Sequence, residues 1–354
     1  MVKVLKVGVF GAGAWGTAVA KVLKENGNRV EIWSFEEDVK DDININLKND
    51  KYLSGIRLPK GIKASTLPEE VAQDKDYIVL VVPSLFILET IKKILGVPNI
   101  REGKTLIGIL TKGFIETDRG VRLITEVLED YLPGFYKGNL VYIAGPSHAE
   151  EVARGKLTGL ISASQNGKNA IKFRKLFSSS NLIVFPSLDV TGVQVSAAVK
   201  NVIAIAFGIL DALKESSDNF GDNTESLLLA AGLNEIQALG IALGSTHPET
   251  FTSIAGVGDL DVTCRSKYGR NRKFGREIIL KDLLKSFKNI DDLILRISEL
   301  GYMPEGVSAA RCARKLSAQY KLELPIVNGI FKILNREKEP VDELKHILSR
   351  LTKV

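Results

Sequence analysis

Strand-like and helix-like segments alternate through the first half of this 354-residue chain, and the alternation stops near residue 187. Short, continuous apolar runs rich in β-branched residues occur at 5–10, 29–35, 76–83, 105–110, 140–145, 159–164 and 181–186. Strands of this kind are expected where helices cover both faces of a parallel sheet. Segments with helical spacing lie between several of them, at 18–25, 86–95 and 121–131. The pattern predicts a doubly wound α/β domain over residues 1–187.

The second half of the chain shows helical spacing without a strand pattern. The helical segments fall at 189–213, 224–243, 276–288, 309–320 and 326–335. Because a chain of this length fits two domains of ordinary size, we predict a second, all-α domain over residues 188–354. The polar stretch at 214–223 is expected to be a loop between two of its helices.

Composition argues against several classes of protein. The net charge is only +6, and acids and bases are interspersed, so no basic arm suggests nucleic acid as a partner. Cys264 and Cys312 form no CxxC motif, and no His/Cys cluster predicts a metal. The N-terminal apolar run is too short for a signal peptide, and Lys200 with Asn201 interrupts the longest apolar segment. We therefore expect a cytoplasmic protein with reduced thiols, no membrane span and no metal.

A glycine motif follows the first predicted strand. FGAGAWGTAVA places Gly11, Gly13 and Gly16 in the pattern GxGxxG at the start of a predicted helix. In such a loop the first glycine permits a tight turn, the second admits a pyrophosphate, and the third allows close packing of helix and strand. The motif predicts dinucleotide binding, and the alternative is a glycine turn that only packs.

The end of the second predicted strand bears on the choice between NAD and NADP. An acid there binds the ribose 2′-hydroxyl, whereas an arginine favours the 2′-phosphate of NADP. The sequence reads EIWSFEED, in which Glu36 and Glu37 would repel a 2′-phosphate. This favours NAD, although Ser34 and Phe35 occupy the expected contact positions.

Three further strand ends carry polar residues. VVPSLF at 81–86 is either a nicotinamide-side turn or an ordinary one, and Lys112 in LTKGF is either a ligand contact or a surface lysine. In AGPSHAEEVARG, Ser147 is predicted to cap a helix, with Glu150 completing a capping box. The same helix start is also a place for an anionic group. His148 lies in that turn, and a surface or capping role is favoured over a catalytic one.

Lys200 is the only charged residue within residues 191–210. It shares a helical stripe with Val193, Ala197 and Ala204. A helix that is apolar all round is buried, and burial lowers the pKa of an ammonium group. Lys200 is therefore a candidate acid and base near neutral pH, and the alternative is a lysine whose head group reaches water.

The segment AGVGDLDVTCRSKYGRNRKFG supplies possible partners for Lys200. Asp259 and Asp261 are candidate counter-ions. In the following RNRK run, Arg270 and Asn271 suit a phosphate group, because the planar guanidinium matches phosphate oxygens. The alternative for that run is a solvated charge cluster.

Together these motifs resemble those of NAD(P)-dependent glycerol-3-phosphate dehydrogenases. The similar segments occur in the family's order, from residue 6 to about residue 335. They are GAGAWGTA, WSFEED, KYLSGIRLP, VVPSLF, TKGF, GPSHAEEVARG, AAVKNVIAIAFGI, GDNTESLL, AGVGDLDVTC, GRNRKFG and PEGV. The combination of VKNVIAIA with GDLDVTC and GRNR is specific, unlike the glycine motif alone.

The resemblance implies a Rossmann-type N-terminal domain and an α-helical substrate domain. It implies interconversion of sn-glycerol 3-phosphate and dihydroxyacetone phosphate with NAD(H), NADP being possible, to supply phospholipid synthesis in a cytoplasmic homodimer. Lys200 is then the proton donor and acceptor, with Lys112 and Asp259 as the other catalytic residues. The implied substrate-binding residues are Lys112, Gly145, Ser147, Asn201, Asp259, Thr263, Gly269, Arg270 and Asn271. The implied cofactor-binding residues are Gly11, Gly13, Ala14, Trp15, Gly16, Phe35, Phe86, Lys112, Ala149, Arg270, Met303 and Glu305.

Some motifs depart from the bacterial branch of this family. WSFEED and KYLSGIRLP look more like the eukaryotic, NAD-using branch, and AGPS stands where bacterial members more usually have SGP. A related dehydrogenase for 3-hydroxy acids or 6-phosphogluconate is an alternative enzyme. A non-catalytic dinucleotide sensor is an alternative of another class, but it would need only the glycine loop.

Overall fold

The computed structural model describes residues 4–351, and the chain divides into two compact units. The strand-rich unit holds the residues up to Thr111 together with Ile124–Val190. The helical unit holds Lys112–Leu123 together with the residues from Thr191 onward. The predicted ranges 1–187 and 188–354, whose first and last three residues lie outside the described part, did not place residues 112–123 with the helices. That segment belongs there because Phe114, Val121 and Leu123 are buried in the helical core.

The strand-rich unit contains an eight-stranded sheet in the order β10-β9-β8-β5-β4-β1-β2-β3. Its strands are β1 (Lys6–Phe10), β2 (Arg29–Trp33), β3 (Ile62–Ser65), β4 (Tyr77–Leu80), β5 (Leu106–Ile109), β8 (Val141–Ala144), β9 (Thr158–Ala163) and β10 (Leu182–Ser187). The doubly wound prediction is confirmed, because the strand order changes direction between β1 and β4. This switch point is where open α/β sheets bind ligands. The edge strand β3 was not predicted, since only alternate residues in it are buried.

One strand pair departs from the predicted parallel sheet. Strands β8 and β9 are antiparallel, whereas β9 and β10 are parallel to each other. The connection from β8 to β9 contains only the five-residue helix α7 (Ala149–Ala153). A parallel return needs a crossover that runs back along the sheet, usually on a longer helix. The chain instead re-enters the sheet at the end where it left.

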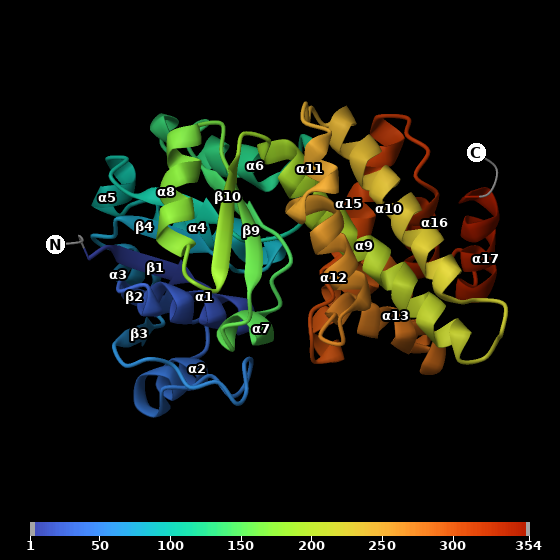
Figure 1. Ribbon diagram of the computed structural model, residues 1–354, viewed down its shortest axis with the longest axis horizontal. Coiled ribbons are helices and arrows are strands. Elements are labelled where there is room, and N and C mark those ends of the chain that lie inside the picture. The colour runs from blue at the N-terminus through green and yellow to red at the C-terminus, as the bar shows by residue number, and fades with distance from the viewer. Residues whose placement is uncertain (1–3, 352–354) are drawn as a thin grey trace. The chain divides into compact units, whose positions relative to one another are not determined.

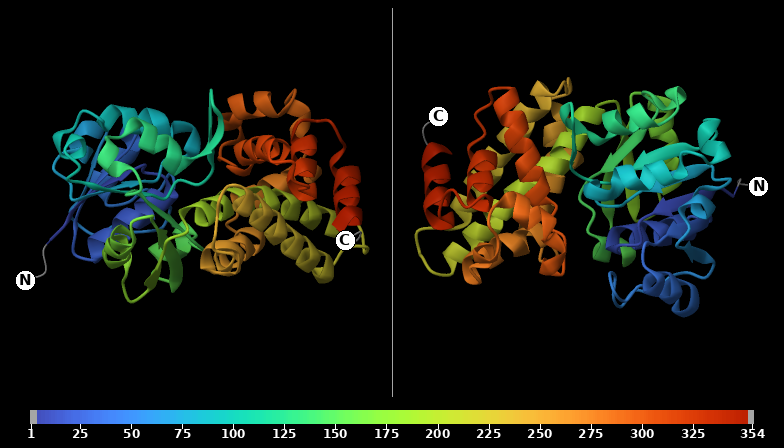
Figure 2. Two further views of the ribbon diagram at one scale, coloured as in Figure 1. Left: turned by 90° about the horizontal axis from the view of Figure 1, so that it is seen from above. Right: turned by 180° about the vertical axis from the view of Figure 1, so that it is seen from behind.

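Helices cover both faces of this sheet, as the views of the strand-rich unit in Figures 1 and 2 show. On one face, α1 (Ala14–Glu25) contacts both α7 and α8 (Gly167–Phe177). On the other face, α4 (Ile87–Ile94) contacts α3 (Pro68–Ala72) and α6 (Ile124–Tyr131). The remaining short helices are α2 (Glu37–Asp41) and α5 (Pro98–Arg101), with helical turns at Asp42–Asn46, Ser84–Phe86 and Gly134–Tyr136. The helix predicted at 121–131 begins only at Ile124. Its first three residues belong to a hairpin of β6 (Phe114–Thr117) and β7 (Gly120–Leu123).

The helical unit is all α apart from that hairpin. Its helices are α9 (Val190–Lys214), α10 (Asp222–Ala242), α11 (Glu249–Thr252), α12 (Asp259–Arg265), α13 (Arg270–Leu280), α14 (Ile290–Leu295), α15 (Gly306–Gln319), α16 (Pro325–Leu334) and α17 (Pro340–Leu351). Helical turns occur at Ile254–Gly258, Leu283–Ser286 and Ile297–Leu300. The short helices α11, α12 and α14 and the terminal α17 were not predicted. The predicted second domain of helices is otherwise confirmed.

Helix α9 forms the centre of this unit. It is long and apolar enough to cross a membrane, but its most apolar stretch is entirely buried among the other helices. Two neighbours reach its backbone at glycines: a Cβ on Gly275 of α13 would lie 2.1 Å from the Ile205 carbonyl oxygen, and one on Gly306 of α15 would lie 2.5 Å from that of Asn201. Because these glycines carry no side chain, α13 and α15 pack directly on the part of α9 that follows Lys200.

Candidate active site

The glycine loop after β1 has the shape that dinucleotide binding requires. Gly11 has a φ of +119°, a conformation that favours glycine. A Cβ on Gly16 would lie 1.7 Å from the Gly11 carbonyl oxygen, so only glycine fits where α1 meets the loop. Gly13 precedes Ala14 at the start of α1 and has no atom within 4 Å of its ideal Cβ position. The loop is therefore closed by Gly11 and Gly16 and open at Gly13, where backbone N–H groups can receive a pyrophosphate.

The other predicted cofactor residues of the strand-rich unit lie near the ends of elements on this sheet. Trp15 is half-buried in the first turn of α1, and Phe86 is half-exposed where α4 begins. Phe35, just after β2, is 81% exposed. Ala149 is buried as the first residue of α7. The glycine loop packs closely against the segment after β4, because a Cβ on Gly11 would lie 3.0 Å from the Val82 backbone nitrogen.

The turn between β8 and α7 differs from the predicted capping box. Gly145 has a φ of +148°, and the Ser147 hydroxyl donates to its carbonyl oxygen at 3.0 Å. The N-cap residue of α7 is His148, and no side chain caps the helix. Ser147 lies one residue before the N-cap position and therefore does not cap the helix. The capping prediction is therefore wrong, while His148 lies at the helix start as expected.

Lys200 lies in a buried polar cluster inside the helical unit. Its ammonium group contacts the Asp259 carboxylate and donates to the Thr263 hydroxyl at 2.8 Å. Lys200 is 3% exposed and Asp259 is 1% exposed, so neither group reaches water along the helix surface. The Thr263 hydroxyl in turn donates to the Asp259 carbonyl oxygen at 2.6 Å. The predicted contact between Lys200 and Asp259 is present, and the bond to Thr263 orients the Lys200 ammonium group.

The position of Asp259 follows from a local feature of the chain. Residues Ile254–Gly258 form a π-helical turn, and Asp259 is the first residue of the helix α12 that follows. A Cβ on Gly256 would lie 2.0 Å from the Phe251 carbonyl oxygen, so the turn can be this tight only with glycine. Thr263 is one helical turn after Asp259, which aligns both side chains on one face toward α9.

Lys112, two residues before the hairpin, approaches the same carboxylate. Its ammonium nitrogen lies 3.5 Å from Asp259 Oδ2, whereas Lys200 contacts Oδ1. Oδ2 is buried and accepts no hydrogen bond within residues 4–351. The hairpin is fixed to α15 by ion pairs of Glu116 with Lys315 and Arg311. Lys112 and Lys200 are thus held on the two oxygens of one buried carboxylate.

Burial has the largest effect on Lys200. It lowers the pKa of the ammonium group from its ordinary value of 10.5 to about 7. The positive charge of Lys112 also lowers this pKa, and the negative charge of Asp259 opposes both effects. A lysine with this pKa can release and regain a proton near neutral pH.

The predicted phosphate-binding residues lie where α13 begins. Gly269 is its N-cap residue, and Arg270 begins the helix on an exposed surface. Within residues 4–351 the Arg270 guanidinium pairs with no carboxylate. The buried Asn271 side chain donates to the Asn201 side-chain oxygen and accepts from the Gly306 backbone, at 2.9 Å each. These bonds tie the start of α13 to the turn of α9 that carries Lys200.

The remaining predicted residues lie at the start of α15. Met303 is half-buried against the helical core, and Glu305 is the half-buried N-cap residue of the helix. The Asn271 bond to Gly306 connects this helix start to that of α13. The structure therefore brings Lys200, Lys112, Asp259, Asn201, Thr263, Gly269, Arg270, Asn271, Met303 and Glu305 into one unit. It places Gly145, Ser147, Ala149 and the remaining predicted cofactor residues in the other unit.

Sequence reasoning missed the residue that anchors α13. The Asp211 carboxylate of α9 is buried and pairs with Arg272, whose guanidinium also donates to the Arg265 carbonyl oxygen at 2.6 Å. Within the RNRK run, Arg272 is thus bound to Asp211 and Lys273 lies over the Tyr302 ring, whereas Arg270 has neither kind of partner among residues 4–351. Asp211 lies eleven residues after Lys200, three helical turns along the same helix. That second charge in the apolar segment was the available signal. Within the described residues no group of three or more His, Cys, Asp or Glu side chains could hold a metal.

Comparison with known proteins identifies the family. The profile for the NAD-dependent glycerol-3-phosphate dehydrogenase N-terminus matches residues 6–170, and the profile for its C-terminus matches residues 189–345. This chain belongs to the NAD-dependent glycerol-3-phosphate dehydrogenase family. A Treponema denticola glycerol-3-phosphate dehydrogenase, named as using NAD(P)+, is 55% identical, with 98% of this chain and 99% of the relative covered.

More distant family members agree over nearly the whole chain. A Clostridium botulinum enzyme of the same name is 37% identical, with 98% of this chain and 97% of the relative covered. A crystal structure of glycerol-3-phosphate dehydrogenase from Coxiella burnetii has a TM-score of 0.82 and 29% identity, covering 98% of this chain and 99% of its own.

Proposed function

We propose that this chain interconverts sn-glycerol 3-phosphate and dihydroxyacetone phosphate with NAD(H), Lys200 carrying the proton. The observation that supports the proposal is the buried ammonium group of Lys200, hydrogen-bonded to both Asp259 and Thr263, in a chain of this family. A carbonyl reduction needs an acid beside the carbonyl oxygen, and the reverse reaction needs a base there. A lysine with a pKa of about 7 serves both directions.

In the proposed reaction the dinucleotide, when bound, supplies or accepts the hydride. Lys200 donates a proton to the C2 oxygen during reduction and removes it during oxidation. The positive charges of Lys200 and Lys112 stabilise negative charge that develops on that oxygen. Asp259 and Thr263 hold the lysine, and Arg270 binds the phosphate, so binding energy remote from C2 serves alignment.

The loop geometry fits a dinucleotide, and the residues after β2 favour NAD over NADP. No residue of 34–38 is basic, and Glu36 and Glu37 are acidic. We propose NAD(H) as the preferred cofactor, with the pyrophosphate on the N-terminus of α1. A cytoplasmic location, a homodimer and a role in supplying glycerol 3-phosphate for phospholipid synthesis are also proposed, on the family resemblance alone. The oligomer is tested by light scattering of the purified protein.

Replacing Gly16 by alanine should destabilise the protein and abolish tight NADH binding, because the new Cβ would clash with the Gly11 carbonyl at 1.7 Å. We expect an unfolding free energy lower by about 1–3 kcal/mol. Gly13→Ala is the matched variant, because its Cβ meets no protein atom. It should fold normally and still weaken NADH by about tenfold or more, by blocking backbone approach. Chemical denaturation measures the loss of stability, and fluorescence titration measures the affinity for NADH. An equal loss of stability in both variants would contradict the predicted difference between Gly16 and Gly13.

The pH dependence follows from the state of Lys200 in each direction. Reduction requires the protonated form, so its kcat/KM should fall as pH rises through about 7. Oxidation requires the neutral form, so its kcat/KM should rise through the same range. Because Lys112 lowers the pKa of Lys200, Lys112→Met should move both profiles to higher pH. Profiles that coincide in the two directions would exclude Lys200 as the titrating group.

Initial rates with dihydroxyacetone phosphate, comparing NADH with NADPH, test the proposal directly. The proposal requires substrate-dependent oxidation of NADH and much slower turnover of 6-phosphogluconate and of 3-hydroxy acids in the oxidative assay. Faster turnover of one of those compounds would favour the related dehydrogenase. Tight NADH binding without any turnover would favour the dinucleotide sensor.

A further inference from the structure

The segment that follows β2 contains cations, but every one of them is paired with a carboxylate. Residues 34–52 carry six acidic residues and three lysines. Lys51 lies 2.8 Å from Glu36 and 3.0 Å from Asp38. Lys40 pairs with Glu37 and Asp41, and Lys48 pairs with Asp50. This position matters because the end of the second strand in such a domain receives the 2′-substituent of the adenosine ribose.

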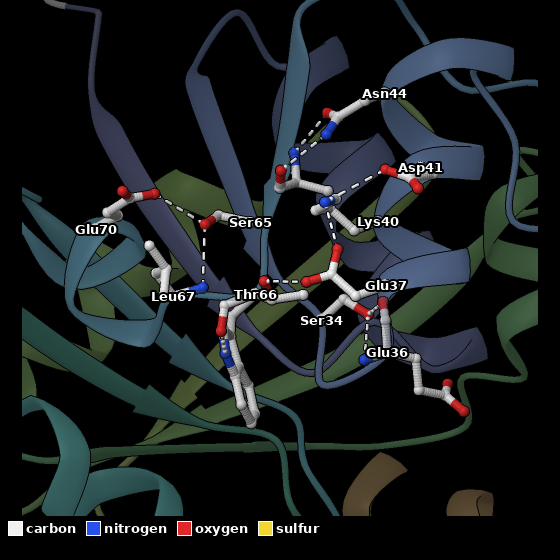
Figure 3. A network of polar contacts seen from close by, with 12 residues as sticks. Ser34, Glu36, Glu37, Lys40, Asp41, Asn44, Ser65, Thr66, Leu67 and Glu70 are labelled. Atoms are coloured by element: carbon white, nitrogen blue, oxygen red, sulfur yellow. Dashed lines mark hydrogen bonds and ion pairs between the residues drawn. The ribbon is translucent and has the colours of Figure 1, made fainter.

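The Glu37 carboxylate and the turn that carries Glu36 are themselves held by residues at the end of the sheet. Figure 3 shows the Glu37 carboxylate between Lys40 and the Thr66 hydroxyl, which donates to it at 2.9 Å just after β3. The Ser34 hydroxyl is buried and donates to the Glu36 carbonyl oxygen at 2.8 Å, which sets the turn that carries Glu36. Ser34 is thereby occupied within the protein. The serine at the expected contact position is not presented to a ribose.

We infer that Lys51 and Lys40 are masked phosphate-binding residues, held away from a 2′-phosphate by Glu36 with Asp38 and by Glu37 with Asp41. The inference rests on the proposed use of a dinucleotide. A 2′-phosphate entering here would have to compete with two carboxylates for each ammonium group, in addition to being repelled by them. The preference for NAD is therefore set by removable side chains, and the chain already holds the cations that NADP would need.

Lys51 is the better candidate of the two. Lys51 lies in a turn, and its partners are 15 and 13 residues before it. Lys40, in contrast, is paired with Glu37 and Asp41 of its own helix α2. The Lys51 side chain is 44% exposed, against 26% for Lys40. The paired carboxylates raise the pKa of Lys51, which keeps it fully charged at neutral pH. Once released, it is available to a phosphate as a cation.

Binding of adenosine 2′,5′-bisphosphate and of 5′-AMP to the substrate-free protein tests the inference without any catalysis. In Glu36→Gln/Asp38→Asn we expect the affinity for the bisphosphate to rise about tenfold, through one new charge-assisted contact, with 5′-AMP unchanged within about twofold. The kcat/KM for NADPH should rise by a similar factor while that for NADH stays unchanged. Glu25→Gln, which breaks the exposed pair with Lys21 at the far end of α1, is the matched control and should change neither.

Adding Lys51→Met to the double variant separates a released lysine from the mere loss of negative charge. If Lys51 is the receiving group, most of the gain for the bisphosphate disappears in the triple variant. A gain that persists there, or no gain in the double variant, overturns the inference. If the wild-type protein binds these adenosine phosphates but does not reduce dihydroxyacetone phosphate, the proposed reaction is wrong. The inference about the lysines is then still decided by the bisphosphate affinities of the double and triple variants.

Discussion

Lys200→Ala should lower kcat for dihydroxyacetone phosphate reduction by about 10³- to 10⁴-fold, the range expected for loss of an acid that also stabilises charge. NADH affinity should change little, because the glycine loop belongs to the other unit. Lys214→Ala is the matched control on the same helix, since Lys214 lies at its partly exposed end and pairs with Asp222 and Glu225. Its turnover should stay within about twofold of the wild type, as for other substitutions of exposed ion pairs. Near-normal turnover of Lys200→Ala would reject the assignment.

Folding must be separated from catalysis in this variant. Removing Lys200 leaves the Asp259 carboxylate buried opposite Lys112 alone, and breaking a buried ion pair costs about 3–5 kcal/mol of stability. Lys200→Met/Asp259→Asn removes both members of the pair and should recover much of that loss. Its turnover should remain as low as that of Lys200→Ala. Recovery of activity together with stability would mean that Lys200 serves the fold only.

Arg270→Ala should raise the KM for dihydroxyacetone phosphate by about 10- to 100-fold, because a charged hydrogen bond to phosphate contributes about 1.5–3 kcal/mol. The kcat at saturation should fall less. Dihydroxyacetone, which lacks the phosphate, separates the effects: the variant should treat it as the wild type does. A change confined to the KM for NADH would show that Arg270 contacts the cofactor instead.

Two neighbouring arginines serve as comparisons for Arg270. Arg276 is on the same helix and pairs with Glu215 at the surface, so Arg276→Ala should leave the KM for the phosphate substrate unchanged. Arg272 is bound to the buried Asp211, so Arg272→Ala should destabilise the protein as well as raise that KM. The contrast between the three variants separates phosphate binding from support of the helix.

The buried cluster around Lys200 was predictable because an ammonium group conflicts with an apolar helix. An ammonium group in an apolar helix requires a partner, and the motif containing Asp259 and Thr263 was the available source. The sheet was predictable because β-branched runs buried on both faces are distinctive. Neither argument depended on how distant elements pack.

The features that could not be predicted depend on tertiary contacts. Residues 121–131 have apolar positions compatible with a helix, yet Val121 and Leu123 form a strand because the hairpin packs against the helical core. Ser147 matched a capping pattern, but its hydroxyl donates to the Gly145 carbonyl oxygen and the N-cap residue of the helix is His148. The anchoring role of Asp211 required knowing that α13 crosses α9 at Gly208, where a Cβ would lie 2.0 Å from the Arg272 carbonyl oxygen.

The segment of residues 112–123, which contains the hairpin, restricts how this protein can be dissected. A fragment that begins at Thr191 would lack Lys112, and it would expose the surface that Phe114, Val121 and Leu123 cover in the helical core. A fragment that ends near residue 187 would carry those three apolar side chains without the core that buries them. Any attempt to obtain the helical unit alone therefore has to supply the hairpin with it, for example by joining residues 112–123 to residue 191 through a short flexible linker. Because residues 112–123 belong to the helical unit, the glycine loop can be exchanged with that of another dehydrogenase while Lys112 and Lys200 keep their places beside Asp259.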